Sequence, residues 1–180
     1  KRLKVNGAPT RALKWVGQMI VVLFLPTDIE LVSGSPSVRR HFLDVALCQI
    51  DARYCDALNR YNKVLQQRNH HLKELQERGG DISSVHMWDD ELVENGTLLM
   101  VRRQAVMTRL DELVQTIHPE LTGGRERLRL LYRPHLAVGA QVNYQLPLGP
   151  DFSTSFHHPT LDADDVRETF RRALLASEAK

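Results

Sequence analysis

Two long stretches in the middle of the chain carry apolar residues at helical spacing. The first covers residues 52–78, where apolar side chains recur in steps of four and three. They are Tyr54, Leu58, Tyr61, Leu65, Leu72 and Leu75, with Arg68 at the one polar step. This heptad spacing predicts a helix of about 40 Å that packs lengthwise against another helix. We expect Asp51 to cap its N-terminus, and Gly79-Gly80 to end it.

A matching stripe follows in the next stretch, which ends near residue 118. Its apolar positions are Trp88, Leu92, Leu99, Val106, Leu110, Leu113 and Ile117, with a gap at Asn95-Gly96. We expect Ser84 to cap this helix, and Pro119 with Gly123-Gly124 to end it. Because neither stripe is stable in water alone, the two predict an antiparallel helical hairpin.

Shorter elements are predicted before the hairpin. Residues 1–5 predict a strand that enters a turn at Asn6-Gly7. The continuous apolar run of residues 19–25 predicts a strand buried on both faces. Ser35, as the cap, and Pro36 begin a helix that is predicted to end near residue 50. Its expected inward residues are Phe42, Leu43, Ala46, Leu47 and Ile50.

Further elements are predicted after the hairpin. Residues 128–132 predict a strand and residues 140–146 a weak one. Residues 162–176 predict an amphipathic helix whose inward residues are Val166, Phe170 and Leu174. The fold class that follows is α+β and mainly α-helical.

The net charge of +2 over 180 residues conceals charged zones. Residues 81–120 hold eight acids and three arginines, whereas residues 1–20 hold five basic residues and no acid. The five are Lys1, Arg2, Lys4, Arg11 and Lys14, and they are candidates for contacts with a DNA phosphate backbone. Ordinary solvated surface charge is the alternative interpretation.

The longest apolar run and the first residue of the chain indicate what class of protein this is. The longest apolar run, residues 19–25, is too short to cross a bilayer, so no membrane segment is expected. The chain begins with Lys rather than Met, which favours a piece of a longer protein.

Cys48 and Cys55 are seven residues apart, in one helix or at the junction of two. Two turns of one helix separate α-carbons by about 10 Å, too far for a disulfide. We therefore expect reduced, largely buried thiols of a cytosolic protein.

Several enzyme motifs are absent from the sequence. There is no GxxxxGK[ST], no GxGxxG, no apolar run ending in paired acids and no nucleophile elbow. His70-His71 and His157-His158 are adjacent pairs that do not converge on one ion, so no metal site is expected.

Residues 21–44 are the most informative stretch. An apolar run leads through Pro26, Thr27 and Asp28 to a segment with Gly34, Pro36, Arg39, Arg40, Phe42, Leu43 and Asp44. This stretch resembles the V-V-x-F-x-P-E-D-L-x-L-V-K-G-x-P-x-x-R-R-x-F-L-D block of the RecF family of recombination mediators. Thr27, Ile29 and Ser33 stand where the family usually has Glu, Leu and Lys.

The resemblance continues along the chain. The matching residues are Arg60, Tyr61, Gln67, Arg68, Asn69, Trp88 and Asp89, followed by residues 120–125 and 131–134. The match is strong over residues 20–75, fair over 84–134 and faint after 135.

The resemblance implies the middle of an ABC-type ATPase related to the heads of SMC proteins. Residues 1–34 would supply strands and a loop of the head, 35–124 a helical arm, and 125–180 the return toward the head. Walker A, signature and Walker B motifs are not present, so the piece is expected to be inactive alone and to hold no cofactor. ATP and Mg²⁺ would belong to the full-length protein.

The resemblance also implies a cytoplasmic role in DNA repair, recombination, replication and the SOS response. The full-length protein would dimerise with ATP, bind gapped DNA or single-strand/double-strand junctions, and help RecO and RecR load RecA. A free-standing helical scaffold that binds protein partners is the alternative function.

Several residues of the family-like segments have more than one possible role. Pro26, Thr27 and Asp28 stand near the Q-loop position of ABC heads, but a turn-stabilising role is favoured for Asp28. Arg39 and Arg40 are candidates for DNA contacts, or for pairing with acids such as Asp44. In the helical stripe Arg68 sets the register or extends to water, with direct DNA contact as a third interpretation. Tyr61 and Trp88 are expected to be core anchors rather than platforms for base stacking.

Overall fold

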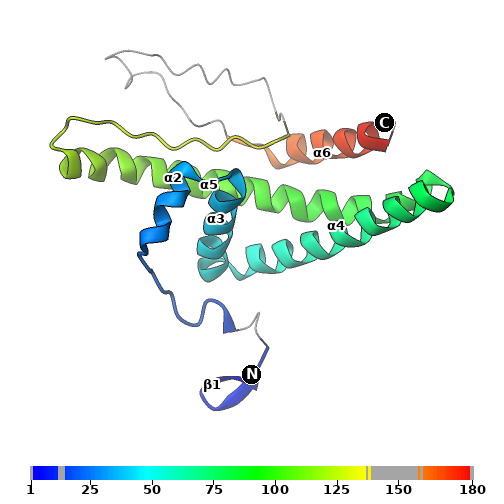
Figure 1. Ribbon diagram of the computed structural model, residues 1–180, viewed down its shortest axis with the longest axis horizontal. Helices are drawn as coiled ribbons and strands as arrows, with labels where there is room; N and C mark the ends of the chain where they lie inside the picture. Colours follow the sequence, from blue (N-terminus) through cyan, green and yellow to red (C-terminus); the bar gives the residue numbers. More distant parts are fainter. Residues whose placement is uncertain (1, 12–14, 137, 139–157, 159, 179–180) are drawn as a thin grey trace.

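A computed structural model describes residues 2–11, 15–136, 138, 158 and 160–178. One long helix, α5 (Asp89–Thr122), runs the length of the molecule with other elements on two of its sides (Figure 1). On one side lie α3 (Pro36–Ile50) and α4 (Ala52–Arg78). On the other side lie α6 (Ala163–Glu178) and the extended residues 128–136. α5 is therefore the spine of the fold.

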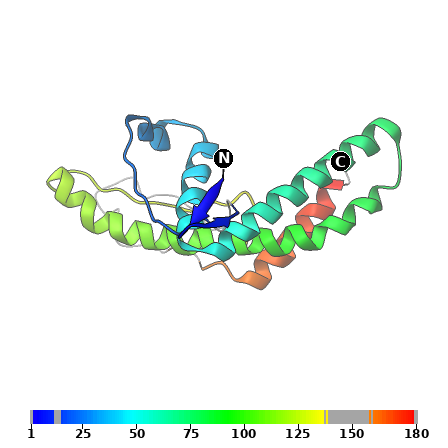
Figure 2. The ribbon, with the colours of Figure 1, turned by 90° about the horizontal axis from the view of Figure 1, so that it is seen from below.

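The antiparallel hairpin of α4 and α5 matches the predicted one (Figures 1 and 2). The Asp51 carboxylate accepts hydrogen bonds from the backbone N–H groups of Arg53 and Tyr54, and so caps α4. Gly79, with φ of +75°, ends α4 in a conformation that favours glycine.

The predicted start of the second hairpin helix was wrong. A 3₁₀ helix, η2 (Ile82–Trp88), fills the tip of the arm, and the Asp81 side chain caps it by accepting from the Ser83 N–H. Ser84 instead donates its hydroxyl to the Asp81 carbonyl. α5 begins only at Asp89, and it passes through Asn95 without a break.

Two stripes of α5 are buried, where one was predicted. Leu99 packs with Leu43 and Leu47 of α3 and with Tyr54 and Ala57 of α4. A second stripe, offset from the first, consists of Val93, Thr97, Met100, Gln104 and Asp111. Two of its members, Val93 and Met100, share a cluster with Val166 and Phe170 of α6. The sequence did not predict this second stripe, because Thr97, Gln104 and Asp111 interrupt its apolar pattern.

The ends of the predicted stripes are less buried than expected. Leu113 and Ile117 of α5 are 41% and 48% exposed. Of the five inward residues predicted on α3, Leu43 and Leu47 are buried, whereas Phe42 and Ile50 are at least half exposed. In the described chain α3 packs its Leu43–Leu47 side against α4 and α5, whereas Phe42 and Ile50 lie away from that side.

The N-terminal hairpin is confirmed. β1 (Leu3–Val5) pairs antiparallel with β2 (Ala8–Thr10), and Leu3 lies opposite Thr10. Asn6 and Gly7 join them with φ of +49° and +82°, which is the signature of a tight hairpin turn.

The buried strand predicted for residues 19–25 was wrong. The segment is extended but has no strand partner within the described chain, and Val22 and Phe24 are 90% and 92% exposed. Its backbone is tied to the helices through the Val21 N–H, which donates to the Gln49 side chain at 2.8 Å. It leads into a 3₁₀ turn, η1 (Pro26–Ile29), and the short helix α2 (Glu30–Ser33).

The strand predicted for residues 128–132 was also wrong, because this segment runs along α5 and pairs with its side chains rather than with a strand. The weak strand at 140–146 lies outside the described residues. The C-terminal helix α6 is confirmed: Val166 and Phe170 are buried, and Leu174 is partly buried. Among the described residues no helix is long and apolar enough to span a membrane.

Gly96 lies where α4, α5 and α6 meet. A Cβ added here would lie 2.9 Å from the Phe170 ring and 3.1 Å from the Tyr61 ring. These two rings pack edge to face with centroids 6.4 Å apart. Glycine therefore allows α6 to approach α5 closely.

We expect Gly96→Ala to lower the free energy of unfolding by about 1–3 kcal/mol, because overpacking at the rings outweighs the gain in helix propensity. Urea unfolding measures the effect of Gly96→Ala in two backgrounds. One is the unaltered chain, and the other is the Phe170→Ala variant. Once the Phe170 ring is removed, alanine at position 96 should cost less, because only the Tyr61 ring remains close to its Cβ. An equal loss in both backgrounds would contradict the close-approach explanation.

Candidate functional site

A largely buried polar triangle joins α3, α4 and α5 near the corner between α3 and α4. Arg103 of α5 donates from Nη2 to Asp44 Oδ1 of α3 at 2.7 Å, and from Nε to the same oxygen at 3.0 Å. Arg103 Nε also donates to the Tyr54 hydroxyl of α4 at 2.8 Å. The Tyr54 hydroxyl in turn donates to Asp44. The side chains of Asp44 and Arg103 are 17% and 15% exposed, so the triangle is largely dry.

The surroundings hold Tyr54 neutral and Arg103 charged. Burial, followed by the hydrogen bond to Asp44, raises the pKa of Tyr54 well above its ordinary value. Burial alone would lower the pKa of Arg103, but its bond to Asp44 and the neighbouring tyrosines raise it overall. The triangle therefore joins the three helices through a neutral tyrosine hydroxyl and a charged guanidinium that both bond Asp44.

A second buried carboxylate fastens residues 128–136 to α5. Asp111 is 1% exposed and accepts from Arg129 Nη2 at 2.8 Å and from the Leu130 N–H at 2.6 Å. His158 Nε2 lies 3.0 Å from the same carboxylate. Burial raises the pKa of Asp111, but the bonds from Arg129, Leu130 and His158 outweigh burial and lower it overall.

The predicted nucleotide-proximal residues form a compact turn. Asp28 Oδ2 accepts from the Leu25 N–H at 2.8 Å, and the Asp28 N–H donates to the Leu25 carbonyl at 2.9 Å. Pro26 and Thr27 lie between them in η1. This geometry agrees with the turn-stabilising role favoured for Asp28.

The paired arginines of the family-like block separate in the structure. Arg39 donates to the carbonyls of Gly34 at 2.9 Å and Leu31 at 3.3 Å, and so fastens α2 to the first turn of α3. Arg40 is exposed, and the Asp44 carboxylate that it was predicted to pair with is held by Arg103 instead. Pro36 occupies the first position of α3, although Ser35 makes no side-chain cap and bonds Ser37 instead.

The arm residues divide into buried and exposed sets. Arg68 is 4% exposed and pairs with Asp89 at 3.0 Å, so it is a register-setting polar residue rather than one that extends to water. Tyr61 is a core anchor, as expected. Three family-like residues of α4 are exposed, namely Arg60, Gln67 and Asn69.

The basic N-terminal residues lie apart from the helices. Arg2 and Lys4 belong to the exposed edge of the hairpin, and Arg11 follows it, also exposed. Lys1 and Lys14 lie outside the described residues. Within the described part of the chain, no group of three or more metal-binding side chains converges.

Sequence reasoning missed Arg103, Asp111 and Arg129. Arg103 falls four residues after Leu99 and three before Val106, in one of the two steps that the α5 stripe left empty; the other is at Asn95-Gly96. Like Arg68 in α4, Arg103 is a polar residue at a position where the apolar stripe would continue. Its spacing therefore already indicated that it faces the helix interface. Asp111 belongs to the second stripe, and no spacing in the sequence points to its partners in residues 128–136.

We predict that Asp111→Asn lowers the free energy of unfolding by about 3 kcal/mol at pH 7, because it removes the charge that neutralises a buried guanidinium. The folded pKa of Asp111 is below its ordinary value of 3.8, so the contribution is complete above that pH and is lost as pH falls through the folded pKa. Urea unfolding at pH 7 and at acid pH measures both effects. The matched control is Glu112→Gln, an exposed neighbour, and a loss equal to that of the control would contradict the clamp.

No family model matches the chain. The chain is 45% identical over 134 residues to the DNA replication and repair protein RecF of Herpetosiphon aurantiacus, covering 73% of this chain and 35% of the relative. It is 41% identical over 138 residues to RecF of Thermosynechococcus vestitus, covering 76% and 36%. RecF of Shouchella clausii is 39% identical over 140 residues, covering 77% and 38%.

The fold is similar to a solved structure of the recombination mediator protein RecF-ATPrS in the RecFOR pathway. The TM-score is 0.81 at 26% identity, over 99% of this chain and 43% of that one. Both comparisons agree on one family, and both cover less than half of the relatives' own length. The chain therefore belongs to the RecF family and spans little more than a third of the curated members that it matches.

Proposed function

We propose that this chain forms the arm and the adjoining part of the head in a RecF-type ATPase of recombinational DNA repair. The likeness to RecF-ATPrS, with a TM-score of 0.81 over 99% of the chain, carries the proposal. In the whole protein, ATP and Mg²⁺ would bind to parts beyond this chain and drive dimerisation. The protein would then bind gapped or junction DNA, and act with RecO and RecR to load RecA.

The exposed apolar segment of residues 19–25 supports a head next to α3. Seven consecutive apolar side chains have no strand partner in the described chain, and burying them in a sheet would remove a large apolar area from water. We assign residues 1–34 to the head on this ground. Residues 35–124 would be the arm, and residues 125–180 would return toward the head.

A continuous set of contacts leads from that segment to the arm. The turn at Pro26, Thr27 and Asp28 would lie near the nucleotide, at the Q-loop-like position. Arg39 binds this region, through the carbonyls of Leu31 and Gly34, to α3. Arg103 then joins α3 to α5 through Asp44. A movement of the head on binding ATP would therefore be passed to the arm without a flexible joint.

The N-terminal basic residues are the proposed DNA contacts. Arg2, Lys4 and Arg11 are exposed, and the first 20 residues of the chain contain no acid. With Lys1 and Lys14 they would face the phosphate backbone, whose recognition is independent of base sequence. Arg40 is exposed and is a separate candidate for a DNA contact, whereas Arg39 is engaged with backbone carbonyls.

We predict that Lys4→Ala with Arg11→Ala weakens binding to a gapped duplex and lowers the salt dependence. The slope of log K against log salt should fall by about 0.9 for each phosphate that the variant no longer neutralises. Fluorescence anisotropy of the labelled duplex over a salt series measures it.

Lys73→Ala with Arg78→Ala is the matched control, because it removes the same charge near the tip of the arm. The control should keep the slope of the unaltered chain. If the unaltered chain fails to bind at low salt, or if both double variants reduce the slope equally, the proposed DNA surface is wrong.

A further inference from the structure

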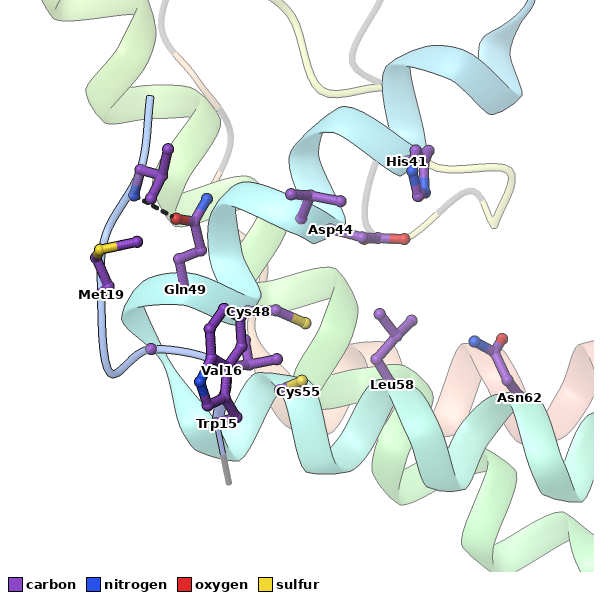
Figure 3. Close-up of a pocket in the computed structure, with 13 residues that line it drawn as sticks. Trp15, Val16, Met19, His41, Asp44, Cys48, Gln49, Cys55, Leu58 and Asn62 are labelled. Atoms are coloured by element: carbon purple, nitrogen blue, oxygen red, sulfur yellow. Dashed lines mark hydrogen bonds between the residues drawn. The ribbon is translucent and has the colours of Figure 1, made fainter. Parts of the chain in front are cut away.

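A pocket lies inside the corner where α3 meets α4, beneath residues 15–21 (Figure 3). Trp15 and Met19 line it from the N-terminal segment, and Val45 and Leu58 line it from the two helices. Cys48 and Cys55 also line it. The walls are mainly apolar, and the polar lining residues are His41, Asp44, Gln49 and Asn62. Cys48 and Cys55 bring two thiols into this pocket.

The corner places the two thiols on facing helices. Cys48 lies in the last turn of α3, and Cys55 lies in the first turn of α4. Asp51 joins the helices with φ of −133° and ψ of 100°, so the chain leaves one helix and turns into the next. The separation of about 10 Å along one continuous helix therefore does not apply here.

Figure 3 shows both cysteine side chains directed into the same space. Both thiols are free and partly exposed, so a small reagent can reach them. Burial, followed by the hydrogen bond and charge of Cys55, raises the pKa of Cys48 to about 12. The influence of Cys55 on the pKa of Cys48 agrees with their closeness in space.

We propose that Cys48 and Cys55 form a reversible disulfide within the folded chain by exchange with a low-molecular-weight disulfide such as oxidised glutathione. The thiolate of Cys55 attacks one glutathione sulfur, which gives a mixed disulfide and releases one glutathione thiolate. Cys48 then loses its proton to that thiolate, and its sulfur attacks Cys55 and releases the second glutathione as a thiolate, which takes the proton of Cys55 through solvent. Two protein thiols are oxidised, and one oxidised glutathione is reduced to two thiols.

The order of the two steps follows from the surroundings of Cys48. Burial in the pocket disfavours the thiolate of Cys48 by raising its pKa, and the thiolate is the attacking form. Cys55 is therefore the first thiol to react, and Cys48 resolves the mixed disulfide. The bond would fix α3 to α4 next to Asp44 and Tyr54, so that the redox state would set the rigidity of the arm's base.

The test measures the equilibrium constant for oxidation of the pair in glutathione buffers, with the whole chain folded and with the chain in concentrated urea. Alkylation of the remaining thiols and intact mass analysis give the oxidised fraction, as a loss of two hydrogens. Because the fold holds the thiols together, the constant of the folded chain should be at least about tenfold higher. An equal or lower constant in the folded chain would overturn the proposal.

Two single variants test the order of the steps. Cys48→Ser should accumulate the mixed disulfide on Cys55, and Cys55→Ser should react at least about tenfold more slowly with oxidised glutathione. Far-UV circular dichroism establishes that each variant is folded. Formation of two stable mixed disulfides on the unaltered chain, or of disulfide-linked pairs of chains, would also overturn the proposal.

Discussion

The rest of the structure depends on the burial of two separate stripes of α5. Leu99 and its neighbours bury one stripe against α3 and α4, while Val93 and Met100 bury the other against α6. A helix of 34 residues is stable in water only when tertiary packing covers its apolar faces. Every other described α-helix packs on α5 or on a helix that contacts α5. The position of each α-helix therefore depends on the buried faces of α5.

Buried carboxylate–arginine pairs fix how each neighbour lies on the spine. Asp44 and Arg103 join α3 to α5, Arg68 and Asp89 join α4 to the start of α5, and Asp111 and Arg129 join residues 128–136 to its far half. Such pairs contribute little net stability compared with apolar residues, but breaking one is costly. In this structure each pair holds its neighbouring segment at one position along α5.

The sequence predicted the helices well, because their periodicity and caps are local. Asp51, Gly79 and the heptad of α4 determine that helix without reference to the rest of the chain. The predicted strands at 19–25 and 128–132 failed for a different reason. A strand is defined by its partner, and an apolar run reports only that it is suited to burial. Residues 19–25 remain exposed, and residues 128–132 bind a helix instead.

The candidate site was only partly predictable, because its important contacts connect residues far apart in the chain. Asp44 was identified through a family-like motif, but its partner Arg103 lies 59 residues away. Arg68 was recognised as the polar step of a stripe, and Arg103 occupies the equivalent step in α5. The polar members of the second stripe, such as Gln104 and Asp111, carry no apolar signal, so their burial is visible only once α5 has been packed.

Hydrogen exchange of the backbone amides of α5 tests the central claim most directly. If two buried stripes make α5 the spine, its amides from Leu92 to Asp111 should exchange only through global unfolding. They should be the slowest in the chain, with no weak point at Gly96. Faster exchange in α5 than in α6, or a separate local opening at Asn95 and Gly96, would contradict this account.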